Sequence, residues 1–60
     1  MDIKVGSRIT FDLDGAVVSG TVTLVSPNRY FVMARTSREE SGGFDFMQVP
    51  MDCILSVKGE

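Results

Sequence analysis

The feature that most constrains this chain is a pair of alternating runs joined by Asp14-Gly15. Apolar and polar residues alternate over residues 9–13, as in a strand with one buried and one exposed face. The run 16–25 is rich in Val and Thr and keeps the same period. Asp-Gly between two such runs predicts a tight β-hairpin, because glycine accepts the positive φ that the turn requires.

The remaining sequence predicts three more short strands. Residues 30–35 and 44–49 are strand-like runs separated by a polar, glycine-containing loop. Pro50 ends the second of them, because proline lacks the N–H that a strand ladder uses. We expect one turn of 3₁₀ helix over residues 50–53 and a closing strand over 54–57.

These elements resemble those of the SH3-like small β-barrels. The similarity lies in the five short strands, a bend at Gly20 within the second strand, and the ending Val49-Pro50-Met51-Asp52-Cys53-Ile54. It covers nearly the whole chain and implies one all-β domain over residues 1–60, a five-stranded barrel with a 3₁₀ turn before the last strand. That fold hosts protein binders, nucleic-acid binders and a few enzymes, so it does not select a function.

The composition excludes several kinds of binding site and reaction. The chain has 60 residues, no histidine and one cysteine, Cys53, so an internal disulfide and a zinc site of His and Cys ligands are ruled out. Without histidine, the usual nucleophile–base pairs are also missing. We expect a protein that is not an enzyme and holds no cofactor or metal. A lone thiol and the lack of a long apolar run favour a cytoplasmic protein that is neither secreted nor membrane-spanning.

The leading hypothesis is a protein-interaction module that associates with itself or with a protein partner. The runs 30–35 and 44–49 are apolar on both faces, whereas a small barrel has a single interior. Some of these side chains should therefore be exposed and available to a partner. The expected interaction surface consists of Arg29, Tyr30, Val32, Arg35, Phe44 and Phe46. The sequence leaves open which face of the run 44–49 is buried, and the core could instead contain Phe11 with Phe44 or Phe46.

An alternative hypothesis is single-stranded nucleic-acid binding by arginine and aromatic side chains on the sheet. The chain has eight acids and six bases, a net charge of −2, which is not typical of a nucleic-acid binder. Glu39, Glu40 and Asp45 would oppose a phosphate. The basic residues that could form a stripe are Lys4, Arg8, Arg29, Arg35 and Arg38.

A remote alternative is catalysis by a pore-forming oligomer. The segments Gly6-Ser7-Arg8-Ile9, Gly20-Thr21-Val22 and Met47-Gln48-Val49-Pro50 are similar to parts of the type II dihydrofolate reductases, which are tetramers of small barrels. That resemblance implies a pore role for Gln48. The chain departs from the family motif because no tyrosine precedes Pro50.

Overall fold

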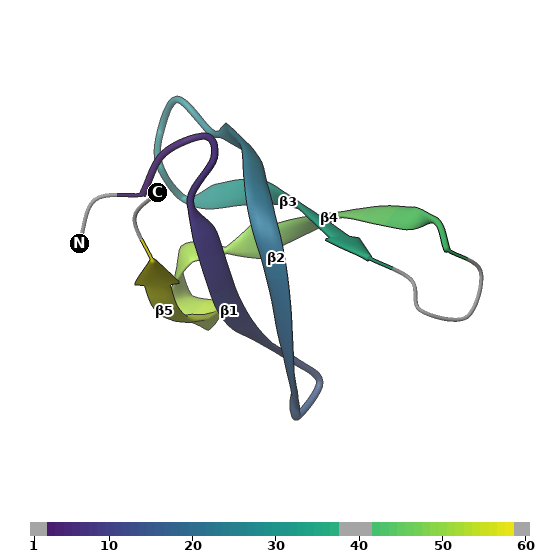
Figure 1. The fold of residues 1–60 in the computed structure, drawn as a ribbon. Coiled ribbons are helices and arrows are strands. Elements are labelled where there is room, and N and C mark those ends of the chain that lie inside the picture. Colours follow the sequence, from purple (N-terminus) through teal and green to yellow (C-terminus); the bar gives the residue numbers. More distant parts are fainter. Residues whose placement is uncertain (1–2, 38–41, 59–60) are drawn as a thin grey trace.

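A computed structural model describes residues 3–37 and 42–58 (Figure 1). The elements, in chain order, are β1 (Arg8–Leu13), β2 (Ala16–Val25), β3 (Phe31–Ser37), β4 (Phe44–Pro50), the 3₁₀ helix η1 (Met51–Cys53) and β5 (Ile54–Lys58). The strands form one antiparallel sheet in the order β4-β3-β2-β1-β5. The described part of the chain is therefore all-β, with η1 directly before the last strand.

This architecture confirms the five strands and the 3₁₀ turn that the sequence predicts. β4 includes Pro50, which is tolerated because β4 lies at an edge of the sheet and Pro50 pairs with Phe31 on one side. In the described residues β4 and β5 are the two edges and do not pair with each other, so the sheet is open there. Closure into an SH3-like barrel stays a prediction.

The β1–β2 turn has the geometry that its sequence predicts. Asp14 and Gly15 both have positive φ, 50° and 90°. Leu13 pairs with Ala16 across the turn, so the loop contains only these two residues. Two central residues with positive φ are typical of a type I′ turn, whose twist matches that of the flanking strands.

The core is built from the inward faces of β1 to β4 and from the segment before β1. Figure 1 shows β3 and β4 crossing behind β1 and β2, so the bent sheet folds over the apolar side chains. Leu24 does not lie on the inward face with Val22, although it is two residues further along β2. The β2–β3 register shifts between these two residues, and this irregularity leaves Leu24 exposed. The buried apolar residues are Ile3, Ile9, Phe11, Val22, Val32, Ala34 and Val49.

The structure also decides which face of β4 points inward. Val49 is buried and Met47 packs against the core, whereas Phe44 and Phe46 are exposed. Neither of these two phenylalanines fills the interior. The phenylalanine in the core is Phe11, whose side chain is only 1% exposed. The two aromatic rings of β4 are therefore left on the outer face of the sheet.

Gly20 lies where β2 passes closest to β3. A Cβ atom at this position would lie 3.1 Å from the carbonyl oxygen of Arg35 and 3.1 Å from Thr36 Cγ2, closer than ordinary contact. Glycine is therefore required by the approach of two strands and not by its φ. This close approach agrees with the bend that the sequence predicts within the second strand.

Replacing Gly20 with valine is expected to lower the free energy of unfolding by about 1–3 kcal/mol, because the added methyl groups overpack the β2–β3 contact. Urea denaturation followed by circular dichroism would measure the change. The control is Ser19→Val at the neighbouring exposed position, where we expect a change within about 0.5 kcal/mol. Equal losses in the two variants would contradict the close approach.

Candidate functional site

The six residues of the predicted interaction surface lie in three different places. Arg29 and Tyr30 belong to the turn between β2 and β3, at one end of β3. Arg35 lies toward the other end, with Phe44 and Phe46 beside it on β4. At about 3.3 Å per residue, Tyr30 and Arg35 are about 16 Å apart along the strand. The structure therefore brings together only part of the predicted surface.

Val32 must be removed from that surface. Its side chain is completely buried, with 0% of its surface exposed. It points to the same side of β3 as Ala34, and both pack in the core. The reason is the two-residue period of the strand, which places Val32 inward once Arg35 points outward.

The β2–β3 turn is fixed by hydrogen bonds to Ser26. Its buried Oγ atom accepts hydrogen bonds from the backbone N–H of Tyr30 (3.1 Å) and Phe31 (3.2 Å), and it donates one to Asn28 Oδ1 (2.8 Å). Arg29 has a positive φ of 61° within this turn. The turn leaves the side chain of Tyr30 74% exposed, away from the residues at the other end of β3.

Arg35, Phe44 and Phe46 form a compact group on the outer face, which we call the aromatic end. The guanidinium carbon of Arg35 lies 4.7 Å from the centre of the Phe44 ring, within the range of a cation–π interaction. Arg35 also pairs directly with Phe46 across β3 and β4. Phe44 and Phe46 remain 56% and 64% exposed, so both rings are accessible to a ligand.

Strand pairing extends this group into a continuous row across the sheet. Arg8 pairs with Lys58 of β5 on one side and with Thr21 of β2 on the other. Thr21 pairs with Arg35, and Arg35 pairs with Phe46. We call this set, with one residue from each strand, the cationic row: Lys58, Arg8, Thr21, Arg35 and Phe46.

Small hydroxyl side chains lie beside the cationic row. Thr10 pairs with Ser56 on one side and with Ser19 on the other, and Thr10 Oγ1 lies 2.6 Å from Ser56 Oγ. Ser37 pairs with Phe44 at the β3–β4 end. Hydroxyl groups both donate and accept hydrogen bonds, so they suit a phosphate oxygen or a sugar hydroxyl.

Two hollows on the surface lie along the cationic row and the hydroxyl residues beside it. One has a volume of about 350 Å³ and lies over β1, β2 and β5, where Lys58 and Ser56 form part of its wall. The other has a volume of about 230 Å³ and extends over β2 and β3 to Phe44 on β4. Arg8 and Ser19 border both hollows, which therefore adjoin along the cationic row.

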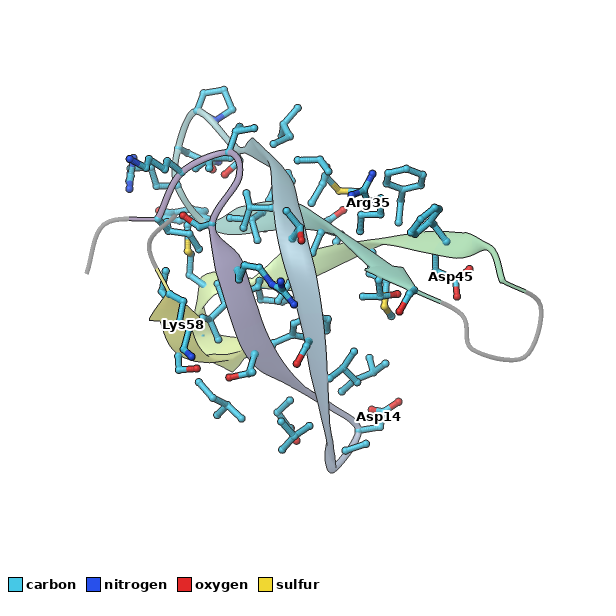
Figure 2. The ribbon with its side chains drawn as sticks, in the orientation of Figure 1. Asp14, Arg35, Asp45 and Lys58 are labelled. Carbon is cyan, nitrogen blue, oxygen red and sulfur yellow. The ribbon has the colours of Figure 1, made fainter. Side chains whose placement is uncertain are left out.

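None of the described residues that line these two hollows is an acid. Figure 2 shows Asp14 at the tip of the β1–β2 hairpin, away from Arg35 and Lys58. It also shows Asp45 on the opposite side of the β3–β4 hairpin from Arg35, as the alternation along β4 requires. Arg38, Glu39 and Glu40 lie outside the described residues.

The other candidate residues, Cys53 and Gln48, do not belong to the cationic row. Cys53 is half-buried and packs against the core. Gln48 is exposed on the outer face of β4, opposite Met33. No cluster of three or more His, Cys, Asp or Glu side chains among residues 3–37 and 42–58 could hold a metal ion. Nowhere in the same residues is there a helix of the length and hydropathy that a bilayer crossing needs.

Sequence reasoning missed Lys58 and the hydroxyl residues that lie beside the row. The end of the chain reads as a tail after residue 57, but β5 continues to Lys58 and places it opposite Arg8. One sequence signal could have indicated this pairing. Polar residues flank one apolar residue both in Arg8-Ile9-Thr10 and in Ser56-Val57-Lys58. Alternation identifies the faces of a strand, but it does not say which strands are neighbours.

No protein-family model, curated protein or solved structure matches this chain.

Proposed function

We propose that this protein is a non-catalytic SH3-like small barrel that binds nucleic acid through the outer face of its sheet. The observation behind this proposal is the cationic row, which contains Lys58, Arg8 and Arg35, with Thr21 between the two arginines. These three residues are half of the six basic residues in a chain that has eight acids. A local concentration of positive charge attracts a polyanion even when the net charge is −2.

The SH3-like part of the proposal is supported by the strand order. β1 pairs with both β2 and β5, and η1 connects β4 to β5. The backbone N–H of Met51 at the start of η1 donates a 2.9 Å hydrogen bond to the carbonyl oxygen of Tyr30, which ties the end of β4 to the start of β3. A cytoplasmic location belongs to the same proposal and is supported by the single free cysteine.

The repulsion between two neighbouring positive charges supports the proposal that this face binds an anionic ligand. Arg8 and Lys58 are directly opposite each other on antiparallel strands, and like charges in this position destabilise a sheet. A phosphate between them would convert this repulsion into two attractions. The hydroxyl groups of Thr10 and Ser56 lie two residues along the same two strands, on the same face and within the same hollow.

A second candidate function is a protein-interaction module, self-associating or binding another protein. The observation that favours it is the exposure of Phe44 and Phe46 on an edge strand. Exposed apolar side chains at a sheet edge are typical of strand-to-strand pairing between chains. Sedimentation velocity across a wide concentration range separates the two candidates, because a strict monomer that binds oligonucleotide fits only the first.

The proposed function predicts salt-dependent binding of a fluorescein-labelled oligo(dT). We expect a Kd on the order of 10–100 μM at low salt, and a slope of log K against log salt near −2, from three phosphate contacts at about 0.7 each. Fluorescence anisotropy over a series of salt concentrations measures both quantities. A protein that shows no binding at the lowest salt concentration contradicts the proposal.

A further inference from the structure

The two ends of the cationic row differ in chemistry, and this difference indicates how a ligand would lie. The end on β5 and β1 offers Lys58 and Arg8 with hydroxyl groups, whereas the other end offers the rings of Phe46 and Phe44. Building on the proposed function, we infer that the face binds single-stranded nucleic acid that crosses the strands of the sheet. Its phosphates contact the β5–β1 end and its bases stack on the aromatic end.

The aromatic end is suited to unpaired bases. Phe46 is 64% exposed and has no ring partner among the interactions found in the described residues, so its face can accept a base. Arg35 lies over the Phe44 ring and opposite Phe46 on the neighbouring strand. A planar guanidinium in this position can stack on a base and contact the phosphate next to it.

The β5–β1 end is suited to the phosphate backbone. Lys58 and Arg8 supply two positive charges, and the hydroxyl groups of Thr10, Ser56 and Ser19 line the same hollow. None of the described residues that line this hollow is aromatic, so they offer charge and hydrogen bonds but no stacking surface. Contacts of this type position a strand without reading its sequence.

The length of the row favours a polymer over a mononucleotide. Lys58 and Phe46 are separated by four strand-to-strand steps, about 19 Å along the sheet at roughly 4.8 Å per step. A single nucleotide would contact only one end of such a row. A duplex would reach the cations but could not place its bases on the rings, because those bases are paired and stacked inside the helix.

The test compares affinity and salt dependence in two variants. Phe46→Leu keeps an apolar side chain but removes the ring, so we expect about tenfold weaker binding to oligo(dT) with an unchanged salt slope. Arg8→Gln removes one charge, so we expect weaker binding and a slope shallower by about 0.7. Tyr30→Leu is the matched control for loss of an exposed ring away from the row, and we expect it to bind like the original chain.

Two further ligands distinguish failure of this inference from failure of the proposed function. We expect oligo(dT) to bind more tightly than a duplex of equal length or heparin, and only oligo(dT) to be weakened by Phe46→Leu. Equal affinity for all three, with no effect of Phe46→Leu, overturns the single-strand inference and leaves nucleic-acid binding standing. No binding of any of them overturns both. A change in sedimentation but not in oligonucleotide affinity for Phe46→Leu assigns the rings to a protein contact and overturns the inference.

Discussion

Replacing Phe11 with alanine is expected to leave most of the protein unfolded at room temperature. Phe11 is the largest fully buried side chain and is 1% exposed. Truncating a buried phenylalanine costs about 3–5 kcal/mol, because the transfer energy is lost and a cavity remains. A chain of 60 residues has a total stability of at most about 3–5 kcal/mol, so the expected loss is as large as the total stability or larger. Circular dichroism and urea denaturation would measure the unfolded fraction.

The matched control for this experiment is Phe46→Ala. It removes the same atoms from a side chain that is 64% exposed, so we expect a loss below about 1 kcal/mol, the size of a cross-strand pair contribution. The contrast tests which ring of the chain is in the core. If Phe46→Ala unfolds the protein as completely as Phe11→Ala, then the inward and outward faces of β4 have been assigned wrongly.

The second large effect is expected from reversing two charges of the cationic row. The double variant Arg8→Glu, Lys58→Glu should weaken binding of oligo(dT) on the order of 100-fold at low salt. Two attractions of about 1 kcal/mol each are replaced by two repulsions of similar size, and the dissolved salt screens part of the total. The two residues remain a like-charged pair, so the free energy of unfolding should change by less than about 1 kcal/mol.

A control with the same change in net charge is available within the chain. Lys4→Glu with Arg29→Glu also lowers the formal charge by two at each position, from −2 to −6, at two exposed sites outside the row. We expect this variant to be weakened by less than about tenfold, because neither side chain belongs to the row and the dissolved salt screens charges that do not contact the ligand. Equal weakening in both double variants would show that net charge, and not the row, controls binding.

The strands could be predicted because they depend on local patterns. Asp14-Gly15 determines a two-residue turn through the positive φ that both residues adopt, and β4 ends at Pro50, which lacks the N–H that a further ladder bond needs. The alternation along β1 places Ile9 and Phe11 on one face in the sequence and in the structure. These are properties of neighbouring residues, so no knowledge of the tertiary structure is needed to predict them.

The candidate site could be predicted only in part. The sequence predicts that Arg35, Phe44 and Phe46 are exposed, because both faces of their strands carry apolar residues, and the three side chains do lie together on the outer face. Val32 was selected by the same reasoning and is buried, because alternation divides a strand into two faces without telling which one packs inward. The partner of Arg8 could not be predicted, because Lys58 is 50 positions away and register is a long-range property.

The sequence alone predicted five short strands, a tight hairpin at Asp14-Gly15 and a 3₁₀ turn before the last strand, and the structure has all three. It also excluded an internal disulfide and catalysis that requires histidine, because the residues for them are missing. Only the tertiary structure decided which face of β4 is buried and which residues form the cationic row. The physical reason is that the buried face of a strand and its register with its neighbours depend on how all five strands pack around one core. Neither property can be read from the residues of one strand alone.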